Sequence, residues 1–213
     1  MKRARTAIGF FLAMVVIFPF RANAAKGFYS SSGIGVEDLG VSGPLTKYIT
    51  TPGVGGALEL VDLGYGIDRS WAVGFKLGAG VQGAKAHTDW ASGGSEDLGY
   101  LGIYGRYNFD RDQRFVPYID AGIGTYLFEE MFGKKSETDT ANIGLNIDVG
   151  GNYFVGSKKR WFIGPEISYQ YADLNSKAQV DIPDSNTSTI NVGKGYNVNM
   201  ILVLFKIGCQ WKK

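Results

Sequence analysis

Apolar and polar residues alternate along most of this chain. In residues 71–82 the odd positions are Trp, Val, Phe, Leu, Ala and Val, whereas the even positions are small or polar. The same alternation runs through residues 142–149 and 161–170. Because successive side chains of a β-strand point to opposite faces of a sheet, this period of two predicts strands with one apolar and one polar face.

Eight segments of this kind follow one another, and most reach the roughly 9–11 tilted residues with which a strand crosses a bilayer. The predicted strands cover residues 27–36, 56–67, 71–82, 98–109, 115–127, 142–155, 161–171 and 197–211. Their connections alternate between short turns, at 68–70, 110–114 and 156–160, and long polar loops, at 37–55, 83–97, 128–141 and 172–196. This arrangement predicts an all-β fold, an eight-stranded antiparallel transmembrane up-and-down β-barrel.

The aromatic residues separate this barrel from a soluble β-sandwich, whose strands also alternate. On the apolar face, nearly every predicted strand has an aromatic residue at its short-turn end. We call this set the aromatic girdle: Tyr65, Trp71, Tyr107, Phe109, Phe115, Tyr153, Trp161 and Trp211. A sandwich core would hold its aromatic residues in mid-strand, where burial is deepest, so their position favours a membrane interface.

Charged residues lie in mid-strand on the opposite, polar face. They are Asp62, Lys76, Arg106, Asp120, Asp148, Glu166 and Lys206, and we call them the lumen charge network. The turns and the strand order bring together three pairs, which are Asp62 with Lys76, Arg106 with Asp120, and Glu166 with Lys206. Because the interior of an eight-stranded barrel is just wide enough for side chains to fill, we expect these charges to pair across the bore.

Two predicted strands depart from strict alternation. In the first, Ser30 and Ser32 lie on the apolar face that Phe28 begins. In the last, residues 200–205 are all apolar, so Leu202 and Leu204 share the inward face of the strand with Lys206. The pattern predicts a strand in both places without explaining these side chains.

The composition excludes several classes of protein. The chain has 213 residues, of which 31 are glycine and 14% are aromatic, a combination that neither a coiled coil nor a disordered chain has. A single cysteine excludes an intrachain disulfide framework and a Cys-rich zinc site. The single histidine argues against a metal site built from histidines. The net charge of +2 gives no basis for nucleic-acid binding. We therefore expect no metal, no cofactor and no nucleic-acid partner.

The first residues have the three parts of a secretory signal peptide. Residues 1–5 are basic, residues 7–20 carry no charge, and a small-x-small cleavage site ends at Ala24. A transmembrane helix needs about 20 apolar residues, more than this segment offers. We expect a signal peptide at residues 1–24 and an exported barrel domain at residues 25–213, in the outer membrane of a bacterium.

Candidate chemistry is sparse. Residues 78–83 match the G-x-G-x-x-G pattern, but no helical segment follows to hold a pyrophosphate, so we interpret these glycines as lumen packing. His87 is the sole imidazole, and nearby Asp89 and Ser92 keep a lipid-modifying barrel enzyme as an alternative. Acid–base catalysis needs groups held rigidly within hydrogen-bond reach, which a glycine-rich loop does not provide. We predict no catalytic residue and no enzymatic activity.

Short motifs carry a family resemblance across the whole predicted barrel. They are Leu63-Gly64-Tyr65 before the first short turn, Pro117-Tyr118 followed by Gly122 and Gly124, and a last strand that closes on Trp211. With these motifs the chain resembles the small outer-membrane β-barrel proteins of the OmpA and OmpX type, including the opacity-like surface proteins. Lys212 and Lys213 depart from the pattern, because such barrels usually end on the aromatic residue that the assembly machinery reads.

The resemblance implies a non-enzymatic surface protein, with the barrel as anchor and four long extracellular loops for interaction or envelope integrity. Its expected partners are outer-membrane lipid and lipopolysaccharide, the barrel assembly machinery, and an extracellular ligand bound by the loops. A narrow porin-like channel for ions or small solutes is the first alternative, and the lipid-modifying enzyme is the second. A fold does not determine a function, so these three functions have to be distinguished by the residues of the lumen and of the loops.

The cleavage site gives a direct prediction about the mature protein. Cleavage after Ala24 should leave Ala25 as the first residue, because signal peptidase reads the small residues that precede the cut. N-terminal sequencing of the protein isolated from outer membranes checks this. An intact Met1 in that sample would contradict the assignment.

Overall fold

The computed structural model describes most of the predicted barrel. The described residues are 27–42, 49–50, 54–68, 70–86, 94–109, 114–132, 135–140, 143–180 and 190–211. They form ten strands, which are β1 (Gly27–Ser42), β2 (Ile49–Thr50), β3 (Gly55–Gly66), β4 (Trp71–Ala86), β5 (Gly94–Asn108), β6 (Phe115–Phe132), β7 (Lys135–Thr140), β8 (Gly144–Val155), β9 (Trp161–Val180) and β10 (Ile190–Gln210). Within these ranges, no helix is long and apolar enough to cross a membrane. The predicted signal peptide lies outside them.

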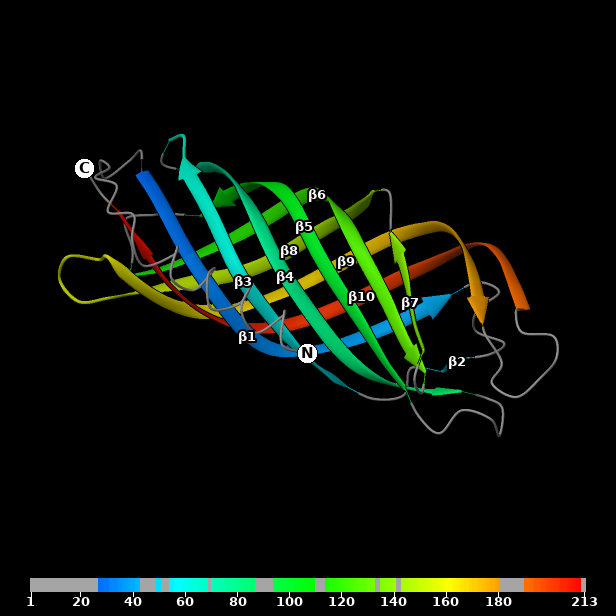
Figure 1. The fold of residues 1–213 in the computed structure, drawn as a ribbon. Coiled ribbons are helices and arrows are strands. Elements are labelled where there is room, and N and C mark those ends of the chain that lie inside the picture. The colour runs from blue at the N-terminus through cyan, green and yellow to red at the C-terminus, as the bar shows by residue number, and fades with distance from the viewer. Residues whose placement is uncertain are drawn as a thin grey trace.

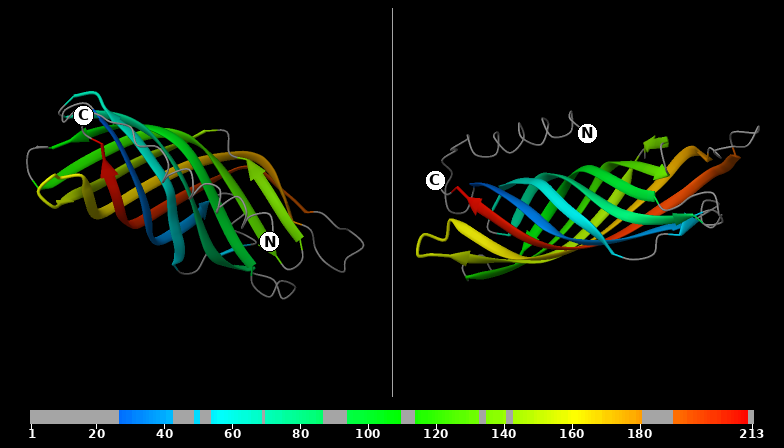
Figure 2. Two further views of the ribbon diagram at one scale, coloured as in Figure 1. Left: turned by 60° about the vertical axis from the view of Figure 1, so that its left-hand side comes forward. Right: turned by 60° about the horizontal axis from the view of Figure 1, so that its bottom comes forward.

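Eight of the ten strands form a closed antiparallel barrel, whose strands wind around a common axis (Figures 1 and 2). The ring runs in the order β1, β3, β4, β5, β6, β8, β9 and β10, and β10 pairs with β1 to close it. The short strands β2 and β7 pair with β4 and β6 outside this ring. Closure gives every ring strand two hydrogen-bonded neighbours, as a sheet requires where no water can satisfy its backbone. The predicted eight-stranded barrel is confirmed.

The ring strands are longer than predicted at the end that carries the long loops. β6 continues to Phe132 and β9 to Val180, and β10 already begins at Ile190. Parts of the segments predicted as loops at 128–141 and 172–196 are therefore paired strand. The alternation of apolar side chains ends sooner than the strands do, because only the height that faces lipid requires apolar outward side chains.

The outward face of the barrel is apolar over a limited height. In β9 the outward residues of 161–171 are apolar or aromatic, and the exposed Asp173 follows them. In β10 the outward residues of 201–211 are likewise uncharged and mostly apolar, and Asn199 precedes them. The Tyr169 hydroxyl donates to the Asn199 side-chain oxygen at 2.8 Å, at the upper edge of this band. An apolar band with polar side chains beyond it is the surface that lipid covers in a membrane barrel.

A β-bulge in β3 reverses the alternation at one point. The register with β4 shifts between Glu59 and Val61, so Leu60 is the extra residue. As a result Glu59 and Asp62, three positions apart, are both fully buried inside the barrel. The Ser32 hydroxyl donates a hydrogen bond of 2.8 Å to the Leu60 carbonyl. The bulge therefore accounts for this serine on the apolar face of β1.

The inward leucines of the last strand belong to a continuous apolar wall. The buried inward residues of β10 before Lys206 are Val198, Met200, Leu202 and Leu204. Leu39 of β1 lies opposite Met200 in the register and is buried as well. These side chains line the long-loop half of the bore on the β10 side, beside buried polar side chains such as those of Glu37 and Gln82.

The closed ring predicts resistance to detergent. Because each ring strand pairs on both sides, sodium dodecyl sulfate alone should leave the barrel folded, whereas heating in it should unfold the chain. Unheated and heated samples should therefore migrate differently on the same gel. Equal mobility, or recovery of the protein from the periplasm without detergent, would contradict a membrane barrel.

Candidate functional site

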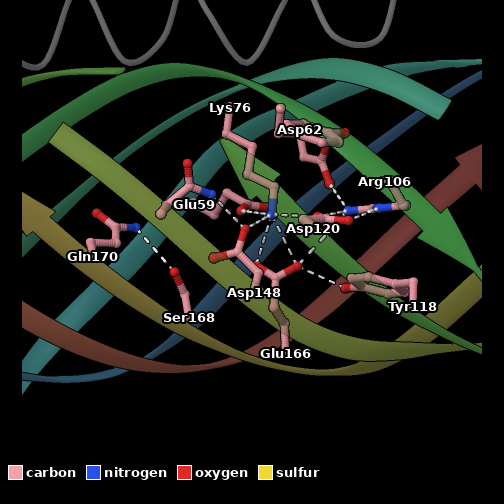
Figure 3. Close-up of polar contacts among 12 residues, drawn as sticks. Glu59, Asp62, Lys76, Arg106, Tyr118, Asp120, Asp148, Glu166, Ser168 and Gln170 are labelled. Carbon is pink, nitrogen blue, oxygen red and sulfur yellow. Dashed lines mark hydrogen bonds and ion pairs between the residues drawn. The ribbon is translucent and has the colours of Figure 1, made fainter. Parts of the chain in front are cut away.

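The interior of the barrel holds a layer of buried charged side chains (Figure 3). We call it the lumen charge layer, and it consists of the seven residues of the lumen charge network together with Glu59. None of the eight is more than 4% exposed. They project from every ring strand except β1, which joins through Ser31, whose hydroxyl donates to Asp62 at 3.2 Å. All walls of the barrel thus contribute to one connected set of polar contacts.

Arg106 is held along its edge by carboxylates and on its faces by aromatic rings. Its Nε and Nη2 atoms each donate to one oxygen of Asp120 at 2.7 Å, a two-point contact that fixes the plane of the guanidinium. Nη2 also donates to Asp62 at 3.2 Å. The guanidinium carbon lies 4.0 Å from the centroid of the Tyr118 ring and 5.2 Å from that of Tyr104, within the range of cation–π attraction.

Lys206 joins the carboxylates of β3 to that of β9. Its Nζ atom lies 2.7 Å from both Glu59 Oε1 and Asp62 Oδ2, and 3.1 Å from Glu166 Oε2. The bulge in β3 is the reason that both carboxylates of this strand reach the same ammonium group. Strict alternation would have turned Glu59 towards lipid, where a charge is costly.

Lys76 occupies the centre of a second cluster, where its ammonium group lies among converging carboxylates (Figure 3). Its Nζ atom lies 2.7 Å from Asp148 Oδ2 and 3.1 Å from Asp120 Oδ2 and Glu166 Oε2. Ligand oxygens of these three carboxyl groups lie within 4.8 Å of one another, a spacing that suits a bound cation. Because the ammonium group takes that central position, we interpret the cluster as an ion network.

Tyrosine hydroxyl groups complete the contacts of the carboxylates. Tyr118 donates to Glu166 Oε2 at 2.7 Å. Tyr104 donates to Asp62, and a Cβ atom on Gly74 would fall on the Tyr104 side chain. The ring can reach its carboxylate only because glycine stands at that position of the neighbouring strand.

The structure brings together all seven residues of the lumen charge network, but it changes one of the expected pairs. Two expected pairs are in contact, Arg106 with Asp120 and Glu166 with Lys206. Asp62 does lie opposite Lys76 in the strand register. The cation nearest to Asp62 is nevertheless Lys206, and the carboxylate nearest to Lys76 is that of Asp148, both at 2.7 Å. Long side chains in a narrow bore reach past their strand neighbours to the opposite wall.

Two further buried carboxylates do not follow from the sequence pattern. Strict alternation from Asp62 assigns Glu59 to the lipid face, and the predicted first strand ends before Glu37. Both glutamates are at most 1% exposed, and the Glu37 carboxylate lies against Gly80. The described interior therefore holds six buried acidic side chains and three basic ones. The sequence does contain one sign of the bulge, because strict alternation places a charged residue, Glu59, on the lipid side of a predicted strand.

One known family matches this chain over most of its length. Residues 8–197 match the family described as outer membrane protein beta-barrel domain. The chain belongs to this family. Barrels of the family lie in the bacterial outer membrane, so the short turns are periplasmic and the long loops extracellular.

Solved structures show the same fold at low sequence identity. Neisserial surface protein A is 18% identical, with 88% of this chain and 99% of that chain covered and a TM-score of 0.54. The outer membrane protein OprG from Pseudomonas aeruginosa is 13% identical, with 92% and 100% covered and a TM-score of 0.61. The outer membrane protein AlkL is 13% identical, with 92% and 96% covered and a TM-score of 0.50. No curated protein sequence matches this outer-membrane barrel.

The residues of the aromatic girdle lie at the periplasmic ends of their strands. Those that are exposed are Tyr65, Trp71, Phe109, Phe115, Tyr153 and Trp161, whereas Tyr107 and Trp211 are half-buried. Rings of neighbouring strands touch, as Trp71 and Tyr107 do with ring centroids 5.1 Å apart. This arrangement suits an interface between lipid and water, where aromatic rings of barrels gather.

The remaining candidates from the sequence do not form a site in the described residues. His87, Asp89 and Ser92 all lie outside them. The glycine pattern at 78–83 lies within β4 and not in a turn that opens a helix, so it does not build a phosphate loop. A Cβ atom on Gly78 would fall on the inward Tyr100 ring, which supports lumen packing.

The cluster around Lys76 predicts the effect of losing its charge. The variant Lys76→Met should lower the free energy of unfolding by about 3–5 kcal/mol, because it leaves buried carboxylates without their central cation. Urea unfolding in zwitterionic lipid vesicles, followed by tryptophan fluorescence, measures this change. Lys158→Met in an exposed turn is the matched control and should change stability by no more than about 0.5 kcal/mol. Equal stability of both variants would contradict the network.

Proposed function

We propose that this protein is a non-enzymatic surface protein of the outer membrane. The barrel serves as a closed anchor, and the extracellular loops make contacts outside the cell. The observation that carries this proposal is the lumen charge layer, which links all walls of the ring across the bore. Buried ions at 2.7–3.2 Å from their partners leave little room for water or solutes to pass between them.

An apolar layer supports closure at the periplasmic end. Its buried members are Tyr29, Ala72, Tyr104, Val116, Phe154 and Phe162, most of them within two residues of a strand end. Phe154 and Phe162 pack edge to face, with ring centroids 5.6 Å apart. An ion that enters from the periplasm would meet this layer before the charged one, and an apolar constriction opposes the passage of ions.

The lengths of the strands support a role outside the membrane. β9 has 20 residues and β10 has 21, about twice the number that a tilted strand needs to cross a bilayer. Paired backbone beyond the apolar band raises the loops above the membrane on a rigid stem. Such a stem suits contacts with large partners at the cell surface.

The narrow channel remains the second candidate, and one observation favours it. Six acidic side chains face three basic ones in the described interior, so any continuous water path would attract cations. For the third candidate, a lipid-modifying enzyme, the sequence provides His87 as the only imidazole base. Because the sequence around it is rich in glycine, which does not hold acid–base groups rigidly, the absence of catalysis is part of the proposal.

Conductance in planar bilayers tests the closed anchor. The wild-type protein should give little or no steady current, because the two interior layers block the bore. Lys76→Met removes the central cation of one cluster and should allow brief openings, whereas the exposed-turn control Lys158→Met should stay silent. A stable, large, cation-selective conductance from the wild type would instead support the channel.

A further inference from the structure

Positive charge is distributed unevenly over the periplasmic end of the barrel. The turn between β8 and β9 contains Lys158, Lys159 and Arg160 and no acidic residue. The other two periplasmic turns are balanced, since residues 67–70 carry one acid and one base and residues 109–114 carry two of each. The charge is therefore a property of one side of the rim, not of periplasmic turns in general.

The end of β10 lies against this turn, and the start of β1 lies beside the end of β10. The backbone N–H of Gln210 donates to the Arg160 carbonyl at 2.7 Å, and its side-chain amide donates to the Lys159 carbonyl at 3.2 Å. The N–H of Trp211 donates to the Phe28 carbonyl of β1 at 2.8 Å. Three basic residues thus lie in a turn to which the end of β10 is hydrogen-bonded.

The turn holds a lysine in a backbone conformation that favours glycine. Lys159 has a φ angle of 45°, in the left-handed region that glycine and asparagine adopt most readily. The same turn already contains a glycine in that region, Gly156 with a φ angle of 76°. At the second left-handed position the chain carries a lysine, although its backbone favours glycine there. The charge is present at a conformational cost.

The apolar neighbours of the turn set its depth relative to the membrane. Trp161 follows Arg160 directly and is 61% exposed on the lipid-facing side, and Val155 and Tyr153 on β8 are also exposed. Tryptophan and tyrosine side chains sit at the level of lipid headgroups in membrane barrels. The basic side chains of the turn therefore start at the depth of the lipid phosphates, within reach of them.

We propose that this basic turn between β8 and β9, to which the end of β10 is hydrogen-bonded, binds an anionic phospholipid of the periplasmic leaflet. Guanidinium and ammonium groups donate charge-assisted hydrogen bonds to phosphate oxygens, and the neighbouring aromatic side chains cover the glycerol and upper acyl chain. A free phosphate ion could use the same basic groups but not this apolar border. The inference depends on the outer-membrane location and not on whether the bore is closed.

Lipid binding tests the proposal in the folded, mature protein. The barrel is reconstituted in phosphatidylethanolamine with a minor share of phosphatidylglycerol, and the phosphatidylglycerol retained per barrel is counted by native mass spectrometry. The wild type should retain it, and the triple variant K158Q/K159Q/R160Q should bind it about a hundredfold more weakly, at about fivefold for each charge lost near a membrane surface. The control Arg114→Gln, in a balanced turn, should bind as the wild type does.

Two further measurements distinguish a lipid site from a site for free phosphate and from a turn whose only role is structural. Inorganic phosphate, compared with chloride at equal ionic strength, should not displace phosphatidylglycerol, and displacement would assign the site to free phosphate and overturn the proposal. Lys159→Gly should weaken phosphatidylglycerol binding while raising the unfolding temperature in phosphatidylethanolamine alone, because it removes both the charge and the backbone cost. Retention by the triple variant equal to that of Arg114→Gln would also overturn the proposal.

Discussion

Three cations buried in a narrow bore determine how the inside of this barrel is built. Removing an ion from water costs several kcal/mol, which is repaid only when the ion has close, well-oriented partners. Lys76, Arg106 and Lys206 each contact at least two carboxylates within 3.2 Å. Because these carboxylates project from β3, β6, β8 and β9, satisfying the cations also fixes the positions of the barrel walls relative to one another.

Other features of the fold serve this requirement. The bulge at Leu60 turns a second carboxylate of β3 inward, where Lys206 lies 2.7 Å away. Gly74 leaves room for the Tyr104 ring, whose hydroxyl reaches Asp62. Apolar side chains lie below the charged layer at the periplasmic end and above it along β10, where the buried Glu37 of β1 lies opposite Leu202. The ion network is thus enclosed by side chains on both sides, which is the basis for proposing an anchor.

The sequence predicts the strands well and the interior in part. Strand positions follow from a simple physical cause, since lipid requires apolar side chains outside while the bore accepts polar ones. The short first turn also gives the register of Asp62 against Lys76 correctly. The register does not predict the ion-pair partners of these two residues, because long side chains reach charged groups on the opposite wall of the bore. Glu59 could not be placed without the bulge, and the strand ends above the membrane lose the alternation that predicts them.

Carboxylates hold each of the three cations of the bore. Solid-state NMR of the labelled protein in lipid bilayers measures this most directly, through correlations between the side-chain nitrogen of Lys76 and carboxylate carbons. We expect correlations to the carboxylates of Asp148 and Glu166, whose oxygens lie 2.7 and 3.1 Å from that nitrogen. A Lys76 nitrogen that correlates with mobile water alone would contradict the claim.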